Sequence, residues 1–302
     1  MAYSTVVCIK QVPDTKKITG DAMRADGTVN RAALPAIFNP EDRNALEAAL
    51  ALRDEHGGSV TVITMGPPAA CEILREALMR GADRAILLTD RRAAASDTLA
   101  TSYILASAVA RLKPDLVFCG RQAIDGDTAQ VGPQMAEKLG YTLVTYLETL
   151  TLEGDTAHAS RNVGNGTEFV TARLPALFTV MESANTLRPP AARRIMRFKK
   201  ALASSEVSQQ VDAALPGSAP EVRLDATRER CAALAEQGLL IEQLGLDEIG
   251  ADPAWCGLLG SPTRVHRIQS IVLAGGNYRE FAADQEGVAT LVTELIAEHT
   301  IG

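Results

Sequence analysis

The chain has 302 residues, of which 46% are hydrophobic and 4% aromatic, and its formal net charge is -7. This length and apolar content can fill one large domain or two modest ones, which excludes disorder throughout. The acidic balance argues against a nucleic-acid partner, which needs concentrated Lys and Arg. The few aromatic residues give no support to a stacking platform for bases or sugars.

The cysteines and the first residues bear on the cellular compartment. Five cysteines form an odd set without a Cys-x-x-Cys pair, which favours buried thiols in a reducing environment. The first 15 residues lack the basic start and the cleavage site of a secretion signal, and no apolar run reaches the ~18 residues of a membrane span. We therefore expect a soluble, cytoplasmic protein without a membrane span.

The first 140 residues alternate short apolar runs with helical patterns. Strands are predicted at 3–10, 59–67, 84–88 and 115–119, and helices at 40–55, around 73–78 and at 97–112. Asn39 is the predicted N-cap of the first helix and Pro40 its first residue. Glu41 and Asp42 follow, where their charge complements the helix dipole. This alternation predicts an α/β fold with a Rossmann-like parallel sheet and helices on both faces.

The pattern changes after about residue 140. Strand-like runs separated by Gly154-Asp155 and Gly164-Asn165-Gly166 predict an antiparallel hairpin addition. Residues 188–220 combine two adjacent prolines, a basic cluster and a Ser/Ala/Gly/Pro-rich stretch, which is typical of a linker or an extended arm outside the core. An amphipathic helix follows near the C-terminus, and it packs on this domain or on a partner subunit. We expect a nucleotide-binding domain at 1–187 and a C-terminal arm, ending in that helix, at 188–302.

The loop GRQAIDGDTAQVGP (120–133) carries the strongest functional signal. It follows an apolar strand and leads into a helical segment, an arrangement in which backbone N–H groups and a helix N-terminus receive phosphate. Gly120 and Gly126 allow tight turns and close approach of the backbone. Polar side chains offer hydrogen bonds, namely Asp125, Asp127, Thr128 and Gln130. The alternative is an ordinary Asp-Gly turn with polar neighbours.

Other strand ends meet this loop if the sheet is parallel. Residues 8–10 follow the first strand, Met65-Gly66 ends the second, and SDTLATS (96–102) opens a helix at the same edge. Hydroxyls and helix amides suit an anion there, whereas Asp97 repels phosphate unless it caps the helix or accepts from a sugar hydroxyl. Alone, this segment is a plain N-cap. Combined with the other strand ends, it predicts the second wall of a dinucleotide pocket.

Several catalytic motifs are missing from the sequence. There is no GxGxxG after the first strand, no phosphate-binding P-loop, no HExxH and no GxSxG. The four histidines are scattered, which indicates neither a catalytic triad nor a metal site. We therefore expect no catalytic residue and no metal ligand, and chemistry that belongs to a bound cofactor. An ATP-cleaving ligase would need a phosphate loop and Mg²⁺-binding carboxylates, and neither is evident.

The order of several motifs resembles the β subunits of electron-transfer flavoproteins. The matching segments are KQVPDT, NPEDRNALEAAL, MGP, GADR, GRQAIDGDTAQVGPQMAE, LPAL and RPP…RRIMRFKKA, spread over about the first 200 residues. The resemblance implies a heterodimer with an α subunit, with FAD held between α and a mobile domain. The β subunit itself would hold an adenine nucleotide, AMP in the ordinary group and a second FAD in the electron-bifurcating group.

The resemblance also implies a set of cofactor-binding residues. It places the backbone of Cys8, Asn39, the Met65-Gly66 turn and the loop 120–131 around the nucleotide. SDTLATS resembles the helix start that receives the FAD pyrophosphate in the bifurcating group. The complete set is Cys8, Asn39, Met65, Gly66, Ser96, Asp97, Thr98, Thr101, Gly120, Gln122, Asp125, Gly126, Asp127, Thr128, Gln130 and Val131. Residues 93–95 are all alanine where that group commonly has aromatic-Ala-Gly, so we expect an altered contact near the flavin.

The function implied by the resemblance is electron transfer within an αβ complex. In the preferred interpretation, NADH reduces the β-bound FAD. One electron passes to the α-side FAD and on to a flavin dehydrogenase, and the other passes to ferredoxin or flavodoxin. The alternative is an ordinary β subunit with structural AMP, which relays electrons between an acyl-CoA-type dehydrogenase and a quinone reductase. SDTLATS and the long C-terminal region favour the interpretation with FAD, and the C-terminal arm is then expected to pack on the α subunit.

Overall fold

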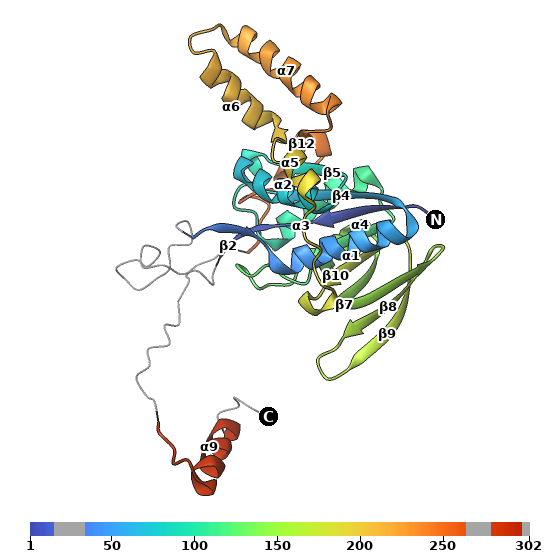
Figure 1. Cartoon of the computed structure of the whole chain (residues 1–302), viewed down its shortest axis with the longest axis vertical. Helices are drawn as coiled ribbons and strands as arrows, with labels where there is room; N and C mark the ends of the chain where they lie inside the picture. Colours follow the sequence, from blue (N-terminus) through green and yellow to red (C-terminus); the bar gives the residue numbers. More distant parts are fainter. Residues whose placement is uncertain (15–33, 264–278, 298–302) are drawn as a thin grey trace. The chain divides into compact units, whose positions relative to one another are not determined.

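A computed structural model describes residues 1–14, 34–263 and 279–297. Residues 1–14 and 34–263 belong to one compact unit, and residues 279–297 belong to a second. The first unit contains all strands of the described residues, and it is drawn in Figure 1 with most of its helices labelled. The candidate site lies in this first unit.

A ten-stranded sheet runs through the first unit in the order β11-β12-β5-β4-β1-β6-β10-β7-β8-β9. All pairings from β11 to β7 are parallel, whereas β7, β8 and β9 pair antiparallel. The strands are β1 (Tyr3–Cys8), β4 (Gly58–Met65), β5 (Arg84–Leu88), β6 (Leu116–Gly120), β7 (Thr142–Glu153), β8 (Thr156–Asn162), β9 (Thr167–Arg173), β10 (Ala176–Val180), β11 (Leu202–Ala203) and β12 (Leu240–Leu244). A small antiparallel sheet pairs β2 (Gln11–Pro13) with β3 (Ala36–Phe38). The predicted α/β fold with a parallel sheet and an antiparallel addition is confirmed.

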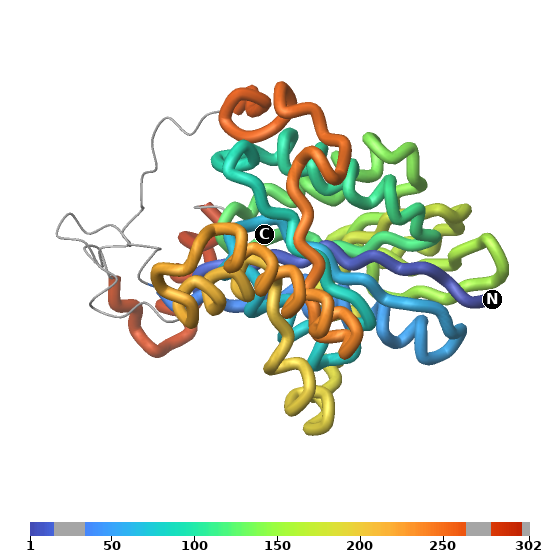
Figure 2. Tube along the Cα trace, turned by 90° about the horizontal axis from the view of Figure 1, so that it is seen from above, coloured from blue at the N-terminus to red at the C-terminus, as the bar shows by residue number. Residues whose placement is uncertain are grey.

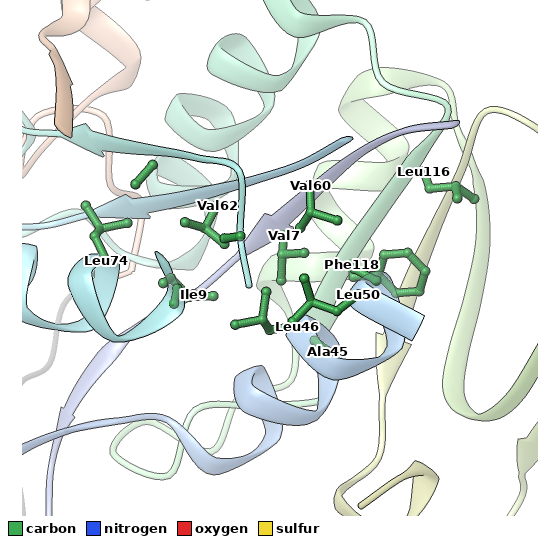
Figure 3. Packing of buried hydrophobic residues seen from close by; sticks show 14 of the residues in the cluster. Val7, Ile9, Ala45, Leu46, Leu50, Val60, Val62, Leu74, Leu116 and Phe118 are labelled. Carbon is green, nitrogen blue, oxygen red and sulfur yellow. The ribbon is translucent and has the colours of Figure 1, made fainter. Parts of the chain in front are cut away.

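Helices cover both faces of the parallel part of the sheet. Neighbouring residues of a strand point to opposite faces, and Val6 and Val7 accordingly belong to two different hydrophobic clusters. Val7 packs with Leu46, Leu50 and Phe118 in the cluster formed with the first two helices (Figure 3). The other cluster contains the buried faces of the third and fourth helices. These helices are α1 (Pro40–His56), α2 (Cys71–Arg80), α3 (Thr98–Leu112) and α4 (Val131–Leu139).

The strand β10 differs from the predicted hairpin pattern. The expected turns at Gly154 and Gly164 join β7, β8 and β9 into an antiparallel ribbon (Figure 1). The next strand, β10, instead lies between β6 and β7 and is parallel to both. All five residues of β10 are buried, because both faces of this inner strand are covered.

The interpretation of residues 188–220 as a linker outside the core is wrong for much of this segment. Phe198, Ala203 and Val207 are buried, and β12 extends the parallel sheet beside β5. The helices after residue 188 are α5 (Ala192–Phe198), α6 (Ser204–Ala214), α7 (Pro220–Glu236) and α8 (Leu246–Ile249). Short 3-10 helices lie at Pro68–Ala70, Arg91–Ala93, Glu182–Ala184 and Pro253–Trp255. The compact unit therefore continues to the end of the described segment at 263, beyond the boundary expected at 187.

The predicted C-terminal amphipathic helix is present as α9 (Gln285–Ala297) in the second unit. No residue of α9 is buried, and its apolar side chains at Val288, Val292 and Ile296 are more than 40% exposed. None of the helices formed by the described residues is both long and apolar enough to traverse a lipid bilayer.

Candidate functional site

A pocket of about 400 Å³ lies at the C-terminal ends of β1, β4 and β6. From β1 the chain passes to β4 and β5 on one side, and α3 then carries it back to β6 on the other side. The pocket therefore lies at the point where the strand order reverses, which is where open α/β sheets bind ligands. Its volume is within the range of small-molecule sites.

Most of the predicted site residues line this one pocket. The end of β4 contributes one of them, the start of α3 contributes four, and the loop after β6 contributes most of the rest. Those that line it are Cys8, Met65, Ser96, Asp97, Thr98, Thr101, Gly120, Gln122, Gly126, Asp127, Thr128, Gln130 and Val131. Three predicted residues, Asn39, Gly66 and Asp125, are not among the lining residues.

Asn39 supports the loop after β6 from behind. It is the N-cap residue of α1 as predicted, but its side chain makes no capping hydrogen bond. Its Nδ2 donates to the carbonyl of Gln122 (2.9 Å), and its Oδ1 accepts from the N–H of Ile124 (3.2 Å). Because Asn39 is fully buried and bonds both sides of residue 123, it fixes the loop without reaching the pocket.

Asp125 and Gly66 also act at a distance from the pocket surface. Asp125 forms an ion pair with Lys10 (2.7 Å from Nζ to Oδ1), which ties the loop to the segment after β1. Gly66 donates its N–H to the carbonyl of Leu88, which joins the ends of β4 and β5. Lys10 lines the pocket itself, although the prediction gave no role to its side chain.

The two glycines of the loop have different roles. A Cβ on Gly120 would lie 2.4 Å from Asp42 Oδ1 and 2.8 Å from Asp42 N, so only glycine fits against the start of α1. A Cβ on Gly126 would meet nothing within 4 Å, and Gly126 does not have a positive φ. Gly126 therefore does not need the left-handed backbone that glycine alone adopts easily. Asp127 and Ala129 are the loop residues with positive φ, at 48° and 53°.

Two acidic residues at the start of α1 are structural supports that the sequence analysis assigned to the helix dipole. Asp42 Oδ1 accepts from the N–H of Gly120 (3.0 Å), and its Oδ2 accepts from the N–H of Lys10 (2.8 Å). Glu41 accepts from the N–H of Gln122 (2.7 Å) and pairs with Arg121. The sequence does not reveal this role, because acidic residues at an exposed helix start give the same pattern. Only the burial of Glu41 and Asp42 distinguishes them.

Burial also changes the proton affinity of these two carboxyl groups. Burial raises the pKa of Asp42 to about 7 in spite of its two backbone hydrogen bonds, which act in the opposite direction. Burial likewise raises the pKa of Glu41, against the effect of the Gln122 N–H and Arg121. Asp42 lines the pocket, so a group that titrates near neutral pH lies at its base.

The start of α3 forms the second wall, and Asp97 is its N-cap. The Asp97 side chain accepts from the N–H of Ala100 (3.0 Å) and from the N–H of Thr263 (2.9 Å). The N-cap alternative is thus confirmed for its carboxylate, and these donors offset the charge that would repel a phosphate. Thr98 Oγ1 lies 2.9 Å from Gln130 Oε1, so the two walls touch across the pocket.

Two thiols lie side by side at the floor of the pocket. Cys8 and Cys119 are paired in register on the adjacent strands β1 and β6, and both line the pocket while nearly buried. The neighbouring Cys8 side chain and burial raise the pKa of Cys119 well above its usual value. The Cys119 thiol therefore stays protonated and unreactive, and it acts here as packing surface.

The pocket has the groups that a nucleotide requires. The N-terminal residues of α4, Val131 and Gly132, line it, and the first N–H groups of a helix have no acceptor within the helix. Lys10 and Arg121 add positive charge, while Ile9 offers an apolar surface for a ring. The residues therefore fit a phosphate together with a flat heterocycle.

Fold and pocket define an α/β protein with a pocket at the strand-order reversal of a parallel sheet. The profile of the Electron transfer flavoprotein domain matches residues 26–205. The chain is 45% identical, over 98% of its length and 99% of the relative, to the electron transfer flavoprotein subunit beta of Clostridium acetobutylicum. The chain belongs to the electron-transfer flavoprotein family and, within it, to the β subunits.

Two other relatives align over nearly the whole chain. The caffeyl-CoA reductase-Etf complex subunit CarD of Acetobacterium woodii is 40% identical, with 98% of this chain and 99% of the relative aligned. The acryloyl-CoA reductase electron transfer subunit gamma of Anaerotignum propionicum is 38% identical, with 98% of each chain aligned. The similarity thus includes residues after 205, where α7, β12 and α8 lie.

Proposed function

We propose that this chain is the β subunit of an electron-bifurcating flavoprotein and that its pocket holds FAD. The two-walled pocket is the observation that carries this proposal. Thr98 and Thr101 on α3 lie opposite the start of α4, so hydroxyls and helix amides face one space. A ligand with two phosphates can use both walls, whereas a single phosphate is satisfied by one.

The residues of the pocket have distinct roles in this proposal. The loop 120–131 and the start of α4 hold one phosphate, and Ser96, Thr98 and Thr101 hold the other. The apolar side chains of Ile9, Met65 and Leu105, which line the pocket, pack on the rings. FAD supplies the acceptance of a hydride and the release of single electrons, while the chain binds it, orients it and excludes water.

The proposed partners follow from the same assignment. NADH is the electron donor, an α subunit carries the second FAD, and a flavin dehydrogenase and ferredoxin or flavodoxin are the acceptors. Support comes from the two relatives named for CoA reductase systems, which align over 98% of this chain. We place the complex in the cytoplasm, and we propose that the C-terminal part of the chain, including α9, packs on the α subunit.

The ordinary type of β subunit, with structural AMP, is the second candidate. The cavity of about 400 Å³ favours it, because this volume lies toward the small end of ligand pockets. In this case the chain relays electrons between an acyl-CoA-type dehydrogenase and a quinone reductase without bifurcation. The two candidates differ in the ligand of the second wall.

A double substitution tests which ligand is bound. Thr98→Val with Thr101→Val removes the two threonine hydroxyls of the second wall, leaves Ser96 in place and keeps the side-chain shape. FAD binding in this pocket should weaken by roughly 1–3 kcal/mol, so flavin per αβ complex falls from two toward one. Released flavin and AMP are counted by chromatography after denaturation of the purified complex. Thr227→Val on α7 is the control, since its hydroxyl bonds only the carbonyl of Arg223.

The outcomes separate the two candidates. One flavin and one AMP per complex, in both wild type and double variant, would establish the AMP type and overturn the FAD assignment. Two flavins in the wild type that persist in the variant would support FAD as the ligand. They would also mean that the hydroxyls of Thr98 and Thr101 do not contribute to its binding.

The role of α9 is tested by its apolar face. Val288→Glu with Val292→Glu should strongly reduce co-purification with the α subunit, because the two side chains lie one turn apart and are exposed. Thr290→Glu with Thr293→Glu adds the same charge to the other face and is the control. Equal co-purification of both variants would contradict the assignment of α9 to the subunit interface.

A further inference from the structure

Residues 252–263, here called the strap, lie against the start of α3 although about 160 residues separate them in the sequence. The strap follows β12 and α8 and passes along α3, as the orange tube beside the teal helix in Figure 2 shows. Asp252 begins it, with its N–H donating to the Tyr103 hydroxyl of α3 (2.9 Å). Cys256 anchors it in the hydrophobic cluster that α3 shares.

Ser261 connects the strap to the second wall of the pocket. Its Oγ accepts from the N–H of Asp97 (2.8 Å) and donates to the carbonyl of Gly257 (2.6 Å). The N–H of Gly257 in turn donates to Ser96 Oγ (3.0 Å), and the N–H of Thr263 donates to the Asp97 carboxylate. Three of these hydrogen bonds thus link the strap to Ser96 and Asp97 at the start of α3. The fourth, from Ser261 to Gly257, lies within the strap.

The fit between strap and wall is close. Gly257 has a positive φ of 59°, and a Cβ there would lie 2.1 Å from the carbonyl oxygen of Arg92. Ser261 is only 5% exposed and does not line the pocket. Ser96 and Asp97 do line it, so the strap holds from outside the residues that face a ligand from inside.

We propose that Ser261 is a positioning residue that sets the preference of the pocket for a dinucleotide over a mononucleotide. The proposal rests on the proposed function of the pocket. The first wall, 120–131, has its own supports in Asn39 and Asp42, whereas the strap contacts the second wall. Loss of Ser261 therefore loosens the wall that only a second phosphate needs.

Ser261→Ala in the complex of the full chain with an α subunit tests this role, with FAD and AMP as probes. After removal of bound nucleotide, FAD affinity should fall roughly three- to tenfold, the equivalent of one hydrogen bond, while AMP affinity changes less than about twofold. Amide hydrogen exchange should rise in residues 96–101 and stay constant in 120–131. Ser160→Ala is the matched control, because Ser160 is also 5% exposed and its hydroxyl bonds Thr149 in the distant ribbon.

The result that overturns the proposal is an unchanged ratio of FAD to AMP affinity in Ser261→Ala. A ratio that falls equally in Ser160→Ala would also overturn it, since general destabilisation would then be the cause. If the wild type binds neither probe, the proposed function fails and the dinucleotide preference fails with it. Hydrogen exchange of residues 96–101 distinguishes these failures, because it reports the contact between strap and wall without any ligand.

Discussion

The two walls of the pocket are supported in different ways. The first wall, 120–131, is tied to the start of α1 by the buried side chains of Asn39, Glu41 and Asp42. The second wall at Ser96 is held by the Asp97 carboxylate at its N-cap and by the strap, through backbone N–H groups and the hydroxyls of Ser96 and Ser261. Supports of the first wall are buried and charged or polar, so changes there affect folding as well as binding. We expect changes in the second wall to cost less stability, because fewer buried groups support it.

The largest effect is expected from Gly120→Ala. The new Cβ would lie 2.4 Å from Asp42 Oδ1 and 2.8 Å from Asp42 N, and backbone atoms cannot move away as a side chain does. We expect a loss of about 3 kcal/mol in the free energy of unfolding, measured by urea denaturation. The same change should release the bound nucleotide, because strand and helix separate at the base of the first wall.

Gly126→Ala is the matched control within the same loop. It meets no atom within 4 Å and needs no positive φ, so its unfolding free energy should stay within about 0.5 kcal/mol of the wild type. Gly126→Val, with a larger side chain at the pocket surface, should weaken nucleotide binding and leave the fold intact. If Gly120→Ala proves as stable as Gly126→Ala, the first wall is not part of the core.

An intermediate effect is expected from Asp42→Asn. Each oxygen of the Asp42 side chain accepts from a backbone N–H, so the amide nitrogen of asparagine faces a donor and leaves it unpaired. The cost should be roughly 2 kcal/mol near neutral pH. Thr98→Val on the second wall leaves no buried backbone N–H unpaired, because the Thr98 hydroxyl bonds the side chain of Gln130. Its cost in stability should therefore be clearly smaller.

The same variant tests the titration of the wild-type carboxyl group. Burial raises the pKa of Asp42 to about 7 in the folded chain, above its value of about 3.9 in an unfolded chain. The folded state therefore binds the proton more tightly, and the stability that this contributes is present below about pH 4 and lost as the pH rises through about 7. Urea denaturation across this window should show a decline in the wild type that Asp42→Asn lacks. Parallel curves would mean that Asp42 titrates elsewhere.

The smallest effect, a gain in stability, is expected from Ala95→Gly, directly before Ser96 of the second wall. Ala95 has a φ of 60°, a left-handed conformation that costs a non-glycine residue about 1 kcal/mol. The variant should be more stable by roughly 0.5 kcal/mol in thermal denaturation. Ala94→Gly is the control, since Ala94 has a φ of -64° and should lose stability. A loss in both would show that the backbone at residue 95 carries no strain.

The regular part of the sheet could be predicted because its residues follow simple periods. The apolar run of β6 and the helical spacing in α1 and α3 gave the correct elements to within a few residues. β12 was missed because its sequence, LIEQL, has one fully buried residue and polar neighbours. It lies next to the short edge strand β11, where the sheet is less covered. Phe198 was missed because Arg194 and Arg197 stack on its ring, so a core contact resembled a basic linker.

The pocket was predictable to the extent that strand ends define it. Thirteen of the sixteen predicted residues line it, but their roles as ligands remain a prediction. The supports were not predictable, because Asp42 and Ser261 act on Gly120 and Asp97 across 78 and 164 residues. No local pattern distinguishes such a residue from a helix-cap acid or a loop serine.

The position of the strap near the end of the chain has a consequence for synthesis. The sheet strands β1, β4, β5 and β6 are complete when residue 120 has been made, and the first wall follows at once. Ser261 emerges about 140 residues later, a delay of roughly 7 to 30 s at the usual elongation rates. During that interval the nascent chain holds one finished wall and one that lacks its outer support. If the pocket holds the proposed cofactor, we expect its capture by the complete pocket to be a late step, reached only when nearly the whole polypeptide has left the ribosome.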